Sequence, residues 1–261
     1  YQKLGRFAES VDQFERCLSV DARQSKAAGY LGVSYYHWAG TQTTDDSREL
    51  LRGEALKYLL QAIDRGFQAP AILHLAGCTL LDAGRTEEAI PYYEAALRQS
   101  ANYASYYGAA RSVPILLEDD IQPTATLNQL GSAYRALQRF DEAADAYQRG
   151  LQISPHDLPM LTNLGNLYRE MGQIVQARVL MQRAVTQAGE HVPSALLNNL
   201  GLLELNEGNF GTALDLFQRA LWIFQNEESG GHPQLSSESA GVGATISANI
   251  NRAEVSLAAL K

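Results

Sequence analysis

The chain has 261 residues, of which 46% are hydrophobic and only 8 are proline, and its formal net charge at pH 7 is −8. The composition excludes a wholly disordered chain. The acidic balance disfavours nucleic acid or an anionic membrane as the main partner, because either would require a basic face. No apolar run approaches the ~20 residues that are needed to span a bilayer.

Residues 1–101 are predicted to form an array of antiparallel helix pairs. The segments 5–18 and 84–97 match position by position, and both have an acidic first turn that suits the positive end of a helix dipole. We interpret each segment as the second helix of a pair. Tyr1 falls on an aromatic position of a first helix, so the chain is expected to begin inside a truncated repeat.

A polar insert is expected at residues 40–50, within the second pair. The distance from Gly32 to Ala55 is 23 positions, whereas the equivalent distance in the regular pairs is 12. Because residues 40–47 are polar and turn-forming, we place the excess in the turn between the two helices. The second helix is then expected to restart near Ser47.

Residues 102–123 interrupt the array again. Tyrosines at positions 103, 106 and 107 predict one more helix, which ends by Pro114, and residues 118–120 form a short acidic loop. A carboxylate pair such as Asp119 and Asp120 can hold a divalent metal, but no neighbouring residues complete a ligand set. A solvated loop is therefore the expectation here.

Residues 124–225 contain three units with a period near 34. In each unit a glycine is followed at fixed distances by an alanine, a large residue and a small residue. These are Gly131, Ala143, Tyr147 and Gly150; Gly165, Ala177, Met181 and Ala184; and Gly201, Ala213, Phe217 and Ala220. Antiparallel helices pack in this way when small residues lie where backbones approach and large ones fill the gaps. Beyond these units, residues 226–243 predict a flexible loop and residues 244–261 a capping helix.

These offsets resemble the signature of the tetratricopeptide repeat family, in which Leu-Gly, an aromatic residue, Ala, a large apolar residue, Ala and a terminal Pro follow one another. Only the first of the three units keeps the last residue, as Pro155. The resemblance implies an all-α solenoid in which antiparallel helix pairs form a right-handed superhelix. It also implies a non-enzymatic scaffold for protein–protein interaction.

In the resembled family, the first helix of each pair lines a concave groove. The matching positions here carry amides and a few arginines, and the predicted peptide-binding residues are Asn128, Gln129, Arg135, Asn163, Asn166, Arg169, Asn198, Asn199, Asn249 and Arg252. An asparagine amide both donates and accepts, so a row of amides can pair with the backbone of an extended peptide.

The row is similar to the asparagine ladder in the repeat arm of O-linked N-acetylglucosamine transferases. It covers only the part of the chain after residue 124, because Tyr30 and Leu75 occupy the equivalent position in earlier pairs. The alternative is that the amides simply solvate an exposed face. Because asparagine is a poorer helix former than alanine, its recurrence at one position favours the peptide-binding interpretation.

The sequence offers no catalytic or metal-binding arrangement. The five histidines are scattered, and no serine lies in a hydrolase-type setting. We predict no enzymatic activity and no cofactor. Cys17 and Cys78 are expected to be reduced packing thiols, which favours a reducing, cytoplasmic setting.

Three functions are compatible with these patterns. The first is a scaffold that binds an extended peptide or a partner subunit in its groove, within a larger complex. The alternative is the substrate-recruiting arm of an enzyme of glycosyltransferase type, whose catalytic domain lies outside this sequence. In a third, purely structural function, the groove is empty and the convex face or residues 102–122 make the contacts.

Overall fold

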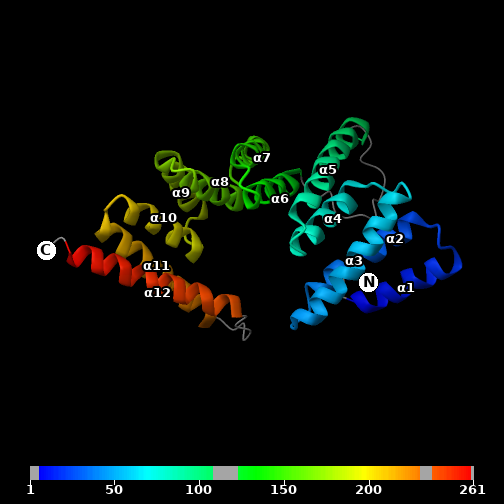
Figure 1. Ribbon diagram of the computed structural model, residues 1–261, viewed down its shortest axis with the longest axis horizontal. Coiled ribbons are helices and arrows are strands. Elements are labelled where there is room, and N and C mark those ends of the chain that lie inside the picture. Colours follow the sequence, from blue (N-terminus) through cyan, green and yellow to red (C-terminus); the bar gives the residue numbers. More distant parts are fainter. Residues whose placement is uncertain (1–5, 108–122, 230–236, 260–261) are drawn as a thin grey trace. The chain divides into compact units, whose positions relative to one another are not determined.

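The computed structural model of the chain describes residues 6–107, 123–229 and 237–259. The described residues fold as twelve α-helices without a strand, which confirms the all-α prediction. The chain divides into two compact units, Tyr1–Gly150 and Leu151–Lys261, whose helices are labelled in Figure 1.

The helices follow one another through short turns. Unit 1 contains α1 (Phe7–Val20), α2 (Ser25–Ala39), α3 (Asp45–Asp64), α4 (Pro70–Asp82), α5 (Thr86–Tyr107), α6 (Pro123–Ala136) and most of α7 (Phe140–Ile153). Unit 2 contains the end of α7, then α8 (Leu158–Glu170), α9 (Ile174–Ala188), α10 (Ser194–Asn206), α11 (Phe210–Ser229) and α12 (Ser237–Ala258). Consecutive helices pack as pairs, among them α2 with α3, α4 with α5, α8 with α9 and α10 with α11.

Each pair closes on a glycine of its first helix, as the repeat pattern predicts. A Cβ atom added at Gly131 would lie 2.6 Å from Tyr147 Cε1, and one at Gly201 would lie 2.6 Å from Phe217 Cε1. The two rings are fully buried. The large residue of each second helix therefore fills the space that the missing side chain leaves, and this contact fixes how closely the two helices approach.

In four of the pairs, the turn between the two helices reverses the chain through one residue with positive φ. This residue comes seven positions after the packing glycine and is Gly84, Gly172 or Gly208 in three pairs, with φ of 73°, 73° and 80°. In the turn between α6 and α7 the same place is occupied by Gln138, at φ 59°. Glycine adopts this left-handed conformation without steric cost, which explains its recurrence at the turn.

The excess residues of the second pair are placed differently from the prediction. Only residues 40–44 lie between α2 and α3, because α3 begins at Asp45 and is 20 residues long. Most of the polar insert is thus helical. Two aspartates in the first turn, Asp45 and Asp46, favour this early start because they interact with the positive end of the helix dipole.

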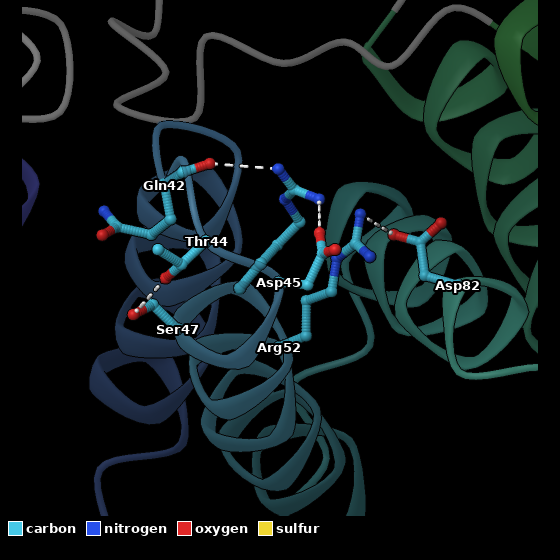
Figure 2. Close-up of polar contacts among 7 residues, drawn as sticks. Gln42, Thr44, Asp45, Ser47, Arg52 and Asp82 are labelled. Carbon is cyan, nitrogen blue, oxygen red and sulfur yellow. Dashed lines mark hydrogen bonds and ion pairs between the residues drawn. The ribbon is translucent and has the colours of Figure 1, made fainter. Parts of the chain in front are cut away.

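Side-chain contacts tie down the short turn before α3 (Figure 2). Thr44 Oγ1 donates to Ser47 Oγ at 2.8 Å. The Arg48 guanidinium donates to Asp45 Oδ1 at 2.6 Å and to the Gln42 carbonyl oxygen at 3.1 Å. Arg48 therefore holds the turn against the first turn of the helix, so that the polar residues form an ordered corner.

Other helix boundaries also differ from the predicted ones. α5 continues without a break to Tyr107, across the start of the expected extra helix. α11 runs to Ser229 and α12 starts at Ser237. These two helices therefore cover much of the segment 226–243, for which a flexible loop was expected. The expected acidic loop at residues 118–120 lies outside the described residues.

The core of unit 1 contains a buried histidine. Residues 71–80 of α4 are all buried, and His74 among them is 8% exposed. Its Nδ1 lies 3.0 Å from Thr126 Oγ1 of α6, and its Nε2 lies 3.4 Å from Cys78 Sγ. The ring also packs edge-on against Tyr93 of α5. His74 therefore links α4, α5 and α6 in a single packed cluster.

A buried carboxylate joins α9 to α10 in unit 2. Glu204 is 7% exposed, and its position holds a tyrosine in the two preceding pairs. Arg178 Nη1 lies 3.4 Å from Glu204 Oε1, and Asn209 Nδ2 donates to Glu204 Oε2 at 2.8 Å. Arg178 also pairs with Glu207. Since a buried charge is costly without partners, Arg178 is needed to hold Glu204 in place.

We expect Arg178→Met to lower the free energy of unfolding of unit 2 by about 1–2 kcal/mol, because Glu204 is left with Asn209 alone. Chemical denaturation measures the change. The matched control is Arg16→Met, which removes an ion pair with Asp12 in which both side chains are exposed. Exposed pairs contribute about 0–1 kcal/mol. Equal effects of the two substitutions would contradict a special role for the buried pair.

Candidate peptide-binding face

The predicted binding residues fall on the first helices of the pairs and are divided between the two units. Asn128, Gln129 and Arg135 lie on α6 of unit 1. Unit 2 holds Asn163, Asn166 and Arg169 on α8, Asn198 and Asn199 on α10, and Asn249 and Arg252 on α12. Helix α10 contacts both α8 and α12, so these three helices are neighbours. We call the seven residues of unit 2 the amide face.

The helical period places the amides at the edge of the core and the leucines inside it. On α10, Leu197 and Leu200 are buried, whereas Asn198 and Asn199 between them are partly exposed. On α8, Leu164 is buried and Asn163 is partly exposed. Arg252 is exposed. The amide face is therefore accessible along three adjacent helices.

Two of the amides pair with each other across helices. Asn249 Nδ2 of α12 donates to Asn198 Oδ1 of α10 at 2.9 Å. An amide has two N–H donors and an oxygen that accepts twice, so the pair still has hydrogen-bonding groups beyond this bond. The bond also fixes the orientation of both side chains and links α12 to α10 on the amide face.

Two polar atoms on α8 lack a partner among the described residues. They are Asn166 Oδ1 and Arg169 Nε, which are buried and lie one helical turn apart. Asn166 Oδ1 can accept a hydrogen bond from a peptide N–H group, and Arg169 Nε can donate one to a peptide C=O group. A buried polar atom without a hydrogen bond costs about 1–3 kcal/mol, so a small side-chain movement toward a ligand would recover free energy.

The two cysteines that the sequence predicted as packing thiols differ in burial. Cys78 is buried, as predicted, but Cys17 is exposed and the packing role predicted for it is wrong. The physical reason is that α1 packs against α2 through Val11, Phe14 and Leu18, which leaves Cys17 on another side. Within the described ranges, no group of three or more His, Cys, Asp or Glu side chains is arranged to hold a metal.

None of the helices, as far as the chain is described, combines the length and the apolar character that crossing a membrane requires.

Family profiles match most of this repeat pattern. The tetratricopeptide repeat profiles match residues 123–190 and 156–226, and also residues 1–24 and 70–103, which together exceed half of the chain. The chain belongs to the tetratricopeptide repeat family. Its fold is accordingly that of a protein-interaction module built from helix pairs.

One curated relative is similar over part of the chain. The protein CTR9 homolog of Arabidopsis thaliana is 28% identical over 104 residues, which is 38% of this chain and 10% of that protein. The chain thus spans only a small part of that relative's length.

Two solved structures share the fold. PilW, described as a widely conserved type IV pilus biogenesis factor, has a TM-score of 0.65 at 16% identity over 93% of each chain. YrrB, described as a tetratricopeptide protein with an unusual peptide-binding site, has a TM-score of 0.52 at 17% identity over 80% of this chain and 91% of YrrB. At these identities the likeness shows the fold alone.

Proposed function

We propose that this tetratricopeptide protein is a non-enzymatic scaffold that holds an extended segment of a partner protein on the amide face of unit 2, within a larger assembly. The observation that carries the proposal is the row of partly exposed amides on three adjacent first helices, with the acceptor Asn166 Oδ1 and the donor Arg169 Nε unpaired among the described residues. The solved structure of YrrB, with its peptide-binding site, supports the class of ligand.

The proposed recognition is directed at the peptide backbone. Asparagine side chains offer donors and acceptors to the C=O and N–H groups that every extended peptide carries, so binding depends little on the peptide's own side chains. Arg169 and Arg252 add positive charge to a chain whose net charge is −8. A peptide with an acidic residue near these arginines is therefore preferred among otherwise equal sequences.

A selection from a random dodecapeptide library tests this proposal. Peptides that bind the intact protein are titrated against a groove variant that combines Asn163→Ala, Asn166→Ala and Asn199→Ala. Each lost hydrogen bond costs about 0.5–1.5 kcal/mol, so the variant is expected to bind about tenfold more weakly or worse. The melting temperature is expected to stay level or rise slightly, because alanine is the better helix former.

The matched control removes three exposed amides from second helices of the same unit, by Gln176→Ala, Gln182→Ala and Gln218→Ala. This variant is expected to bind the selected peptides as the wild type does. Equal binding by the groove variant and the wild type would contradict the proposal, and equal weakening in both variants would show that the amide face is not the specific surface.

A further inference from the structure

Unit 1 has a pocket that shares no residue with the amide face. It has a volume of about 650 Å³ and lies between α5, α6 and α7. Its floor is apolar and consists of Leu97 of α5, Leu130 and Tyr134 of α6, and Ala146 of α7. Three of these four residues are almost fully buried, so the pocket reaches down to the core of the unit.

The aromatic part of the floor is held from two sides. The Tyr134 hydroxyl donates to Glu94 Oε1 of α5 at 3.0 Å. The Arg139 guanidinium lies 4.5 Å from the centre of the Tyr134 ring. Because the ring is fixed before any ligand arrives, an apolar group that packs on it loses little free energy to reorganisation.

The rim of the pocket is acidic. Four carboxylates, on Glu94, Asp141, Glu142 and Asp145, surround it together with two guanidiniums, those of Arg98 and Arg149. Arg149 lies 3.2 Å from Asp145, and Arg98 lies 3.7 Å from Glu94, but these side chains are exposed and such pairs are weak.

The rim carboxylates differ in whether a cation holds them. Glu142 forms an ion pair with Arg139, whose Nη2 lies 2.8 Å from Glu142 Oε1. Arg139 itself does not line the pocket. Asp141, by contrast, makes no ion pair within the described part of the chain. The pocket therefore combines an apolar floor with a negative charge at its edge that no described cation neutralises.

We propose that this pocket docks a short basic segment of a partner protein. A lysine or arginine side chain fits the arrangement, because its aliphatic stem packs on the apolar floor while its charged end reaches the carboxylates at the rim. An aliphatic neighbour in the same segment covers the rest of the floor. Charge complementarity with Asp141 and Asp145 distinguishes this ligand from an acidic segment of the same length.

Two fluorescein-labelled octapeptides test the proposal. The first has the sequence Gly-Ser-Lys-Leu-Leu-Lys-Ser-Gly, and in the second both lysines are replaced by glutamate. Fluorescence anisotropy is measured with the full chain at low salt. The lysine peptide is expected to bind at least about tenfold more tightly than the glutamate peptide, because like charges at the rim oppose the latter.

Two variants show where the lysine peptide binds. Asp141→Asn combined with Asp145→Asn removes two rim charges and is expected to weaken binding by about tenfold. Asp46→Asn combined with Glu54→Gln is the control on α3, since Asp46 is also a first-turn acid and Glu54 also pairs with a nearby cation, Lys57 at 2.7 Å. The control is expected to leave binding unchanged.

The outcomes decide between the alternatives. Equal weakening by both variants would overturn the proposal in favour of non-specific attraction to an acidic protein. Absence of binding by either peptide up to about 1 mM would overturn it as well, since a Kd above that value leaves little free energy for docking. Alanine variants of the amide face are expected to have no effect on this peptide, which keeps the test separate from that of the proposed function.

Discussion

Replacing Gly201 by alanine is expected to lower the free energy of unfolding of unit 2 by about 1–2 kcal/mol. The new Cβ atom would meet the buried Phe217 ring, with 2.6 Å to Cε1 and 2.8 Å to Cδ1. A rigid ring cannot move aside in a close-packed core, and overpacking of this kind costs about 1–3 kcal/mol. The cost exceeds the gain of up to about 1 kcal/mol that alanine brings to a helix.

Gly165→Ala is expected to be milder because the residue that it meets is flexible. The nearest atom is Met181 Cγ at 2.9 Å, and an unbranched methionine can change rotamer. Gly211→Ala serves as the control, since nothing lies within 4 Å of a Cβ atom at that position. Unfolding of unit 2 is followed by Trp222 fluorescence in a Trp38→Phe background. A Gly201→Ala variant as stable as Gly211→Ala would show that this packing account is wrong.

Lowering the pH from 7 to 4 is expected to cost unit 1 about 3 kcal/mol through His74 alone. Burial lowers the pKa of His74 from the ordinary 6.5 to about 4, because the charged imidazolium loses its hydration. Between these two values the unfolded chain binds a proton that the folded unit rejects, so stability falls as the pH falls. A difference of about 2.5 pKa units corresponds to about 3 kcal/mol.

The neighbours of His74 do not titrate in this window. Burial raises the pKa of the Cys78 thiol to about 11, and burial likewise raises the pKa of the Tyr93 hydroxyl. Both groups are therefore neutral at pH 4–7. A neutral histidine accepts at one ring nitrogen and donates at the other, which suits its contacts with Thr126 and Cys78.

His74→Gln provides the measurement, because glutamine does not titrate. Unfolding of unit 1 is followed by Trp38 fluorescence in a Trp222→Phe background at a series of pH values. Whatever its stability at pH 7, the variant is expected to lose about 3 kcal/mol less than the wild type on acidification. Parallel pH profiles for the two proteins would exclude His74 as a source of acid sensitivity.

The packing of the repeats could be predicted from the sequence because it depends on local spacing. A glycine in one helix and a large residue 16 positions later meet whenever two helices are joined by a short turn, as Gly131 and Tyr147 do. The first residues of the helices were harder to predict from the sequence. Asp45 and Asp46 look like part of a turn, yet their interaction with the positive end of the helix dipole places them in the first turn of α3.

The details of the site depend on contacts between distant residues. The bond from Asn249 to Asn198 joins positions 51 apart, and the apolar floor of the unit 1 pocket joins three helices. No local pattern reports such contacts. Glu204 is the exception that leaves a signal in the sequence, since a carboxylate replaces a tyrosine at a core position and so requires a partner such as Arg178.

Photo-crosslinking tests the proposed peptide-binding face most directly. The photoreactive residue p-benzoylphenylalanine replaces either Ala195, which is exposed on α10 beside the amides, or Val179, which is exposed on the second helix α9. A peptide selected from the random library is then irradiated with each protein. Crosslinking from position 195 and not from position 179 is the predicted result. Crosslinking from position 179 alone would contradict the account and move the binding surface to the second helices.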